Sequence, residues 1–216
     1  MKIINFDKEN SLMSQYMLEM RDINIQKDPL RFRRNMERAG QIMAYEISKS
    51  IEYKKVDVTT PLDVAHCQTI ESQIVLATIF RAGLPFHQGF LSYFDYAENA
   101  FVSAYRKYRE KENFDVQIEY LASPRIDGKT LILCDPMLAT GASMELSYRA
   151  LLTKGNPAKV HIASIIASQQ AVDYISDKFP GDTTLWVGAI DPIINPHSYI
   201  VPGLGDAGDL AFGEKD

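Results

Sequence analysis

TLILCDPMLATGAS, residues 130 to 143, is an apolar run that stops at an aspartate and then turns through a small, hydroxyl-bearing loop. The β-branched and leucine-rich residues from Thr130 to Cys134 are typical of a short strand that is covered on both faces. Asp135 marks the point where the backbone leaves the sheet. The next segment, MELSYRALLTKG, has helical periodicity and ends at Gly155. The stretch therefore predicts a strand, a loop and a helix in direct succession.

The loop at residues 139 to 143 has the composition of a phosphate-binding turn. Unpaired N–H groups at the start of the following helix, together with the positive end of its dipole, favour an anion. The hydroxyls of Thr140 and Ser143 would add donors. An ordinary strand-to-helix turn with Ser143 as the N-cap explains the same spacing equally well, so the rest of the chain has to decide between the two interpretations.

The overall composition is that of an ordinary globular protein, and 216 residues are enough to bury a sizeable core. Acidic residues outnumber basic ones, 28 to 23, so the surface would repel a polyanion and no nucleic-acid partner is expected. The amino terminus does not resemble a signal peptide, and no segment approaches the roughly 18 apolar residues of a membrane span. We therefore expect a cytoplasmic protein without a membrane partner. Of the two cysteines, Cys134 is expected in the core rather than as a nucleophile.

Two helices are expected near the amino terminus. Residues 11 to 25 carry apolar side chains at four-residue spacing, and Asp28-Pro29 is a strong start signal for a second helix. A group of arginines along the second helix is typical of a solvated face, although a functional role stays open: Arg31, Arg33, Arg34 and Arg38. Residues 52 to 73 are expected to form extended turns or a hairpin.

Arginines follow two of the predicted strands. The buried run at residues 74 to 80 leads directly into Arg81, where a cation suits an anionic ligand because open α/β sheets bind ligands at the carboxyl ends of their strands. Arg106 follows the strand at residues 99 to 105 in the same way. It begins a charged run that is typical of a solvated loop, and within this run it is the residue expected to face the same crevice as Arg81.

Strand and helix patterns alternate from residue 74 to residue 190. Further strands are expected at residues 159 to 167 and 184 to 190, with a helix over 168 to 179 between them, and residues 116 to 121 resemble the return arm of an extended excursion. This alternation predicts an α/β fold with a doubly wound, mainly parallel sheet and right-handed crossovers.

The last thirty residues break the alternation and are crowded with Pro, Gly and Asp, a composition typical of a structured loop that covers something. Gly203, Gly205 and Gly208 spell GxGxxG, the dinucleotide-binding pattern. That pattern needs a strand before it and a helix with a second strand after it, whereas eight residues follow Gly208. Glycines that let the backbone approach a flat ligand closely are a better explanation.

Three motifs in this order and spacing, RAGLPFHQG, DPMLATGAS and YIVPGLGDAGD, closely resemble the uracil phosphoribosyltransferase family, which belongs to the type I phosphoribosyltransferases. RFRRNMERAGQIMAYE is similar to that family's amino-terminal helix, and Tyr105-Arg106 to its Tyr-Arg pair. The resemblance implies transfer of a phosphoribosyl group from 5-phosphoribosyl 1-diphosphate (PRPP) to uracil, giving UMP and diphosphate with Mg²⁺ as cofactor, in pyrimidine salvage. It also implies a homodimer or higher homo-oligomer and, as in some relatives, a GTP effector.

The same resemblance implies one domain over residues 1 to 216. Its type I phosphoribosyltransferase core would span about residues 70 to 190, and a small hood would come from the C-terminal segment, about 191 to 216, and the N-terminal segment.

Carried onto this sequence residue by residue, the resemblance implies three groups of site residues. The PRPP loop would comprise Asp135, Pro136, Met137, Leu138, Ala139, Thr140, Gly141, Ala142 and Ser143, with the carboxylate of the first near the ribose hydroxyls and the last five around the 5-phosphate. Arg81 and Arg106 would hold the diphosphate, and Asp206 would lie beside PRPP and its Mg²⁺, which no protein residue is implied to bind directly. Uracil would meet Tyr199, Ile200, Gly205, Asp206 and Ala207. Catalytic roles fall to Asp135, Arg106 and Asp206.

The sequence also departs from the family pattern. Ala142 stands where the family commonly has a second glycine, so a positive φ there would be strained. Ile193 and Pro196 replace the usual Gly and Glu, and the arm after Arg106 lacks its usual acidic sequence. Two alternatives stay open: a PRPP- or nucleotide-sensing regulatory protein of the same fold, and a phosphoribosyltransferase for another base.

Overall fold

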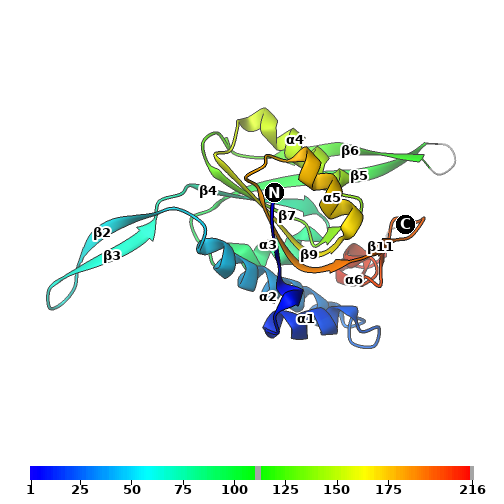
Figure 1. The fold of residues 1–216 in the computed structure, drawn as a ribbon, viewed down its shortest axis with the longest axis horizontal. Coiled ribbons are helices and arrows are strands. Elements are labelled where there is room, and N and C mark those ends of the chain that lie inside the picture. The colour runs from blue at the N-terminus through cyan, green and yellow to red at the C-terminus, as the bar shows by residue number, and fades with distance from the viewer. Residues whose placement is uncertain (110–112, 215–216) are drawn as a thin grey trace.

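The computed structural model describes residues 1–109 and 113–214, and within 104–109 and 113–117 it describes the backbone alone. Its centre is a mainly parallel sheet with the strand order β1-β10-β9-β7-β4-β5-β6, in which the short strand β8 also pairs with β9 (Figure 1). The strands are β1 (Lys2–Asn5), β4 (Ile74–Phe80), β5 (Glu98–Arg109), β6 (Asn113–Ala122), β7 (Thr130–Cys134), β8 (Met137–Leu138), β9 (Lys159–Ser168) and β10 (Thr184–Asp191). The predicted α/β fold with a mainly parallel sheet is confirmed.

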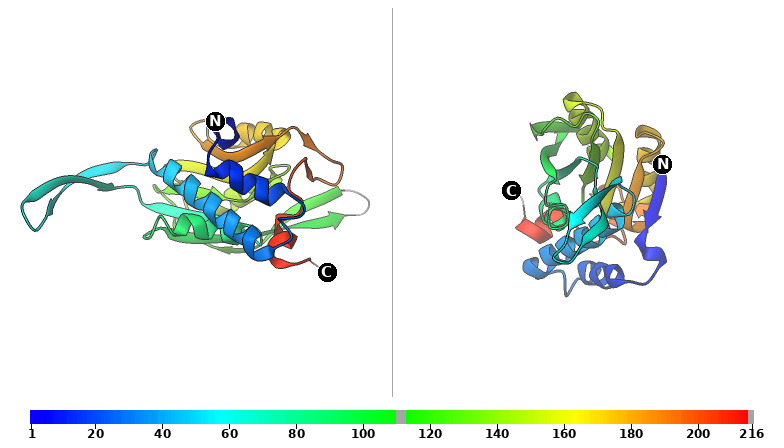
Figure 2. Two further views of the ribbon diagram at one scale, coloured as in Figure 1. Left: turned by 90° about the horizontal axis from the view of Figure 1, so that it is seen from below. Right: turned by 90° about the vertical axis from the view of Figure 1, so that its left-hand side faces the viewer.

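Helices cover both faces of this sheet, as the two views of Figure 2 show. One apolar core lies between the sheet and α1 (Leu12–Arg21), α2 (Pro29–Ser48) and α3 (Gly83–Leu91). The other lies between the sheet and α4 (Ala142–Leu151) and α5 (Gln169–Lys178). Single-turn helices at Phe6–Lys8 and Leu152–Lys154 extend these elements. The strands between the two cores are buried along their length, as their unbroken apolar runs predict.

Several boundaries follow directly from the sequence signals. The strand predicted at residues 74 to 80 is β4, and the one at 130 to 134 is β7. Helix α2 begins after Asp28, whose carboxylate accepts hydrogen bonds from the Leu30 and Arg31 amides at 3.0 and 3.2 Å. The cap and the following proline together explain this start.

Two antiparallel hairpins extend beyond the helix-covered sheet. Strands β2 (Tyr53–Thr59) and β3 (Val64–Ile70) form the hairpin expected between residues 52 and 73, and Figures 1 and 2 show it projecting away from the body. The second is the pair β5–β6. The prediction of a loop from Arg106 onward was wrong, because β5 continues to Arg109 and Arg106 pairs with Val116. Pairing with β6 satisfies the backbone hydrogen bonds there, so this charged run can form a strand without packing against the apolar core.

The C-terminal segment is structured, and its role as a cover stays a prediction. It contains the two-stranded pair β11 (Ile193–Ile194) and β12 (Ile200–Val201), followed by α6 (Ala207–Phe212). Cys134 is buried in β7 as expected, and burial raises the pKa of its thiol well above its ordinary value, which disfavours a nucleophilic role. Among the residues that the structure describes, no helix is both long enough and apolar enough to cross a membrane.

Candidate active site

Two of the predicted site residues, Arg81 and Asp135, lie at the carboxyl edge of the parallel strands. In the sheet register Thr78 of β4 lies beside Cys134 of β7, which in turn lies beside Ala163 of β9. Arg81 and Asp135 therefore leave the sheet from neighbouring strands at the same edge, as the sequence predicted.

The loop after β7 turns into α4 without a side-chain cap. Gly141 is the N-cap residue, with φ of +82°, and no side chain at that position bonds to the helix. The Ala142 amide lies 3.4 Å from Thr140 Oγ1, a long contact. Among the side chains that the structure describes, no carboxylate or hydroxyl of ordinary geometry caps the first N–H groups of α4, which face the loop with the positive end of the helix dipole.

The alternative of a turn capped by Ser143 and the expectation of strain at Ala142 were both wrong. Ser143 is not the N-cap, because α4 has already begun at Ala142. The expected strain at Ala142 is also absent, since the positive φ falls on Gly141 and Ala142 has helical geometry. A single glycine is therefore sufficient for the turn, and the second glycine of the family pattern is not needed for its backbone path.

The rest of the loop is fastened to β9. Pro136 O accepts from the amides of Ile165 and Ile166 at 3.1 and 3.0 Å, and Leu138 of β8 pairs with Ala167 of β9. Ala139 O accepts a hydrogen bond of 2.6 Å from Ser168 Oγ. These contacts fix the loop before any ligand arrives, as preorganised binding of a phosphate requires.

Asp135 stands at the base of this loop. Burial raises the pKa of its carboxyl to about 7, against a smaller lowering by the hydrogen bond from the Met137 amide, which is 3.3 Å from Oδ1. A carboxyl with a strongly shifted pKa at the ligand-binding edge of an α/β sheet is typical of a functional group.

Arg81 follows a cis peptide bond from Phe80 and reaches the C-terminal helix. Its Nη2 donates to Asp209 Oδ1 at 3.0 Å and to Gly213 O at 3.2 Å. The side chain of Arg106 lies outside the described residues, so its predicted place beside Arg81 stays a prediction.

The segment assigned to uracil shares an apolar cluster with the loop after β7. Ile200 and Ala207 are buried in the apolar core under α2, and Met137 and Ala139 of the loop pack against the same cluster. Tyr199 is exposed over 44% of its surface, which makes its side chain a weaker candidate than the backbone groups around it. Asp206 caps α6, because its Oδ1 accepts from the Gly208 and Asp209 amides at 2.8 and 3.0 Å.

Sequence reasoning missed the residues that hold this segment in place. Asp191 is the last residue of β10. It forms a bidentate ion pair with Arg21 of α1 and accepts a hydrogen bond of 2.8 Å from the Gly203 amide. Asp191 lies at the carboxyl end of a buried strand. The same signal identified Asp135 and Arg81, and it could have identified Asp191 as well. Burial would raise the pKa of Asp191, but the hydrogen bonds from Arg21 and Gly203 outweigh it and leave the pKa below its ordinary value.

Side chains from the amino-terminal helices complete this support. Gln26 Nε2 donates to Leu204 O at 3.1 Å, and Arg33 Nη1 donates to Ala211 O at 2.6 Å. The arginines of α2 are therefore not simply a solvated face. Arg33 ties α2 to α6, and no sequence spacing could have indicated so distant a partner.

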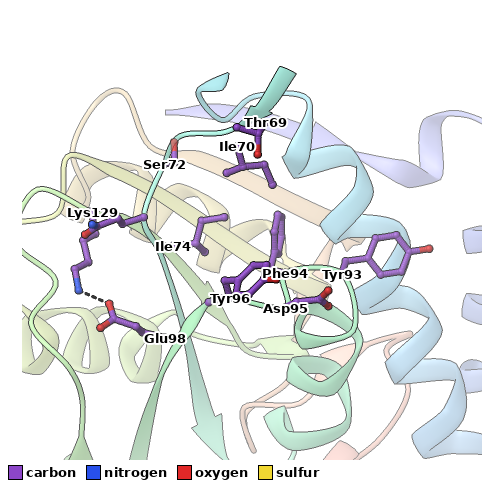
Figure 3. A pocket seen from close by; sticks show the side chains of 12 residues that line it. Thr69, Ile70, Ser72, Ile74, Tyr93, Phe94, Asp95, Tyr96, Glu98 and Lys129 are labelled. Carbon is purple, nitrogen blue, oxygen red and sulfur yellow. Dashed lines mark hydrogen bonds and ion pairs between the residues drawn. The ribbon is translucent and has the colours of Figure 1, made fainter. Parts of the chain in front are cut away.

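A separate hollow of about 560 Å³ lies at the opposite edge of the sheet (Figure 3). It is bordered by Ile74 at the start of β4, Glu98 at the start of β5, and Lys129 just before β7. Figure 3 shows the Lys129–Glu98 ion pair at its margin and aromatic side chains from the 93–96 turn beside it. These are the amino ends of the strands, so this hollow is not part of the site around Asp135.

Known proteins share the sequence and the fold of this chain. The family model described as "Uracil phosphoribosyltransferase" matches residues 8–214. A uracil phosphoribosyltransferase from Porphyromonas gingivalis is 65% identical over 215 residues, covering 100% of both chains. The solved AQ2163 protein from Aquifex aeolicus superposes with a TM-score of 0.87 at 29% identity and 98% coverage of both chains. A hypoxanthine phosphoribosyltransferase from Staphylococcus aureus, with a TM-score of 0.51 and 14% identity over 86% of this chain and 83% of that one, shares the fold. The family model and the full-length relative together show that the chain belongs to the uracil phosphoribosyltransferase family.

Proposed function

We propose that this protein transfers the phosphoribosyl group of PRPP to uracil, forming UMP and diphosphate in pyrimidine salvage. The observation that carries the proposal is the uncapped start of α4, which follows Asp135 through the loop at residues 136 to 141, while Met137 and Ala139 of that loop pack against the apolar cluster that contains the C-terminal residues Ile200 and Ala207. The N–H groups and helix dipole at the start of α4 suit the 5-phosphate of PRPP. The neighbouring backbone of residues 200 to 207 supplies donors and acceptors for a planar base.

The charges at this edge suit the reaction. When C1 of the ribose loses diphosphate, positive charge develops on the sugar and negative charge on the leaving group. Asp135 is suited to the cationic side, and Arg81, with Arg106 as its proposed partner, to the anionic side. Placing fixed charges where charge develops is usually the largest contribution to such catalysis, so a strong base is not required.

The residues present are compatible with Mg²⁺ that arrives on the substrate. Mg²⁺ prefers oxygen ligands and is commonly held by one or two carboxylates together with substrate phosphates. Asp135 and Asp206 offer carboxylates at this edge. Within the described residues no group of three or more His, Cys, Asp or Glu is arranged to hold a metal by itself. Bound Mg²⁺ would neutralise charge on the diphosphate, and we propose that Asp206 lies near it.

Uracil would be selected by hydrogen bonds to the backbone of Ile200, Gly205 and Ala207. Uracil presents two carbonyl groups and N–H groups in one plane, and cytosine reverses one donor-acceptor position through its amino group. A site that pairs with the uracil pattern leaves a buried polar group unpaired when cytosine binds. Discrimination against cytosine by orders of magnitude is the expected result.

Other properties that the family resemblance implies belong to this proposal. We propose that residues 1 to 216 act as one domain, that the protein is cytoplasmic, and that it works as a homodimer or higher homo-oligomer with GTP as an effector. Sedimentation analysis and an assay with and without GTP would test the last two directly.

The activity itself is tested by incubating the purified protein with uracil, PRPP and Mg²⁺ and measuring UMP and diphosphate. Formation of both in equal amounts supports the proposal, and formation of neither contradicts it. Competition among uracil, cytosine, hypoxanthine and adenine decides which base is used. A nucleotide-binding protein without turnover would indicate the regulatory alternative, which is weakened here because Ala142 does not distort the loop.

A further inference from the structure

Arg81, the proposed diphosphate ligand, already has an anionic partner from this chain. Its Nη2 lies 3.0 Å from Asp209 Oδ1 on α6 and 3.2 Å from the Gly213 carbonyl. The side chains of Arg81 and Asp209 are 37% and 32% exposed, so the pair sits at the mouth of the site rather than in the core. An incoming diphosphate would need the same guanidinium.

The geometry indicates that this contact is exchangeable. Arg81 Nε is buried and forms no hydrogen bond within the part of the chain that the structure describes. The contact with Asp209 is made through Nη2, on a side chain that is partly exposed, and the buried Nε does not hold the pair together. The carboxylate of Asp209 is partly exposed and can turn toward water when a more highly charged anion takes its place. Helix α6 stays attached when this happens, since Arg33 still donates to Ala211 O at 2.6 Å.

We propose that Asp209 is a positioning residue that competes with diphosphate for Arg81, and this inference rests on the proposed function. Without ligand, Asp209 orients Arg81 and fastens α6 over the site. When PRPP binds, its diphosphate displaces the Asp209 carboxylate. After the transfer, the return of Asp209 to Arg81 favours release of the diphosphate product, because two anions cannot share the guanidinium at equal strength.

The test is the affinity for diphosphate with Mg²⁺, measured by titration calorimetry without turnover. Asp209→Asn keeps the shape of the side chain but removes the competing charge, so diphosphate should bind about three- to fivefold more tightly, the range for a partly exposed ion pair. Asp209→Ser repeats the test with a smaller neutral side chain. The matched control is Asp177→Asn, which removes the same charge from an exposed position on α5 and should leave the affinity unchanged.

Tighter binding sets this proposal apart from a purely structural role, since a loosened α6 would weaken binding. Unchanged or weaker binding by both Asp209 variants, with normal circular dichroism, would overturn the competition. Arg81→Met separates this result from a failure of the proposed function. If Arg81→Met binds diphosphate poorly and Asp209→Asn has no effect, Arg81 keeps its assignment and the competition alone is wrong. If Arg81→Met binds diphosphate normally, the assignment of Arg81 fails and the competition with it.

Discussion

Arg21 and Asp191, separated by 170 residues in the sequence, form a bidentate ion pair in which both hydrogen bonds measure 2.8 Å. Both residues also hold Gly203. Arg21 Nη1 donates to the Gly203 carbonyl at 3.0 Å, and the Gly203 amide donates to Asp191 Oδ2 at 2.8 Å. Gly203 itself has φ of +63°, and a side chain there would meet the Ile200 carbonyl at 2.0 Å. The pair thus fixes the backbone turn between two residues assigned to uracil, Ile200 and Gly205.

We expect Arg21→Met to weaken uracil binding more than PRPP binding. The substitution leaves the buried Asp191 carboxylate without its charged partner and frees the Gly203 carbonyl. Loss of charge-assisted hydrogen bonds of this kind costs about 1.5–3 kcal/mol, which corresponds to an increase of about tenfold or more in KM for uracil. Steady-state kinetics with each substrate varied in turn would measure it, and an equal rise in both KM values would contradict the assignment.

Arg34→Met is the matched control for this experiment. Arg34 pairs with Glu37 at 2.6 Å on the surface of α2, and its side chain is 61% exposed. An exposed pair of this kind contributes about 0–1 kcal/mol. Both KM values should therefore stay close to those of the unmodified protein.

Gly141→Ala should impair PRPP binding, because Gly141 has φ of +82° and an added Cβ would lie 2.9 Å from Tyr174 Cδ1 and 3.0 Å from Ile175 Cγ2. The loop would have to move away from α5, and the α4 amides would move with it. We expect KM for PRPP to rise by about tenfold, for a cost of roughly 1–2 kcal/mol in a strained backbone.

Ala142→Gly is the corresponding control, since it restores the second glycine of the family pattern at a helical position. It should lower the free energy of unfolding by no more than about 1 kcal/mol, the usual cost of glycine in a helix. PRPP kinetics should be unchanged. A large gain in activity would mean that the loop needs conformations that Ala142 prevents.

The fold was predictable where local signals were strong and the elements long. The apolar runs of β4 and β7 and the Asp28-Pro29 start of α2 each specify their element without help from distant residues. Strand β1 and helix α6, with four and six residues, are too short to show a period. The extension of β5 past Arg106 depends on pairing with β6, which the charged run does not reveal.

The site was predictable only in part, for the same physical reason. Asp135 and Arg81 are identified by their place at the ends of buried strands. Arg33, Asp209 and Arg21 act through partners far away in the sequence, and only the folded chain brings these pairs together. At Ala142 the sequence misled in another way. Its departure from the family motif suggested backbone strain, but the positive φ falls on Gly141 and Ala142 is not strained.

Asp135→Asn should reduce turnover by about 10²- to 10³-fold, the usual effect of removing one charge-stabilising group, while the fold remains intact. The asparagine can keep the hydrogen bond from the Met137 amide, because its side-chain oxygen accepts as the carboxylate does. Single-turnover measurements with PRPP at saturation would isolate the chemical step. Near-normal activity would rule out the role assigned to Asp135.

The same variant makes a prediction about stability. The pKa of Asp135 is raised from 3.8 to about 7, so the folded chain holds a proton between these pH values that the unfolded chain releases. The free energy of unfolding should therefore fall as pH rises from about 4 to 7. Asp135→Asn removes this dependence and should be more stable above pH 7, by about 1–2 kcal/mol after allowance for partial solvent access. Urea unfolding at pH 4 and pH 8 would measure the difference, which should vanish at the lower pH.

Asp206 combines two roles that substitutions can separate. As the cap of α6 it accepts two amide hydrogen bonds, and asparagine caps helices equally well. Asp206→Asn should therefore keep the free energy of unfolding within about 0.5 kcal/mol but raise the Mg²⁺ concentration needed for half-maximal activity, because a carboxylate near the metal is lost. Asp206→Ala should show the same Mg²⁺ effect and also lose about 1 kcal/mol of stability with the cap. If Asp206→Asn matches the unmodified protein at every Mg²⁺ concentration, Asp206 acts through the cap alone and its proposed place beside the metal is wrong.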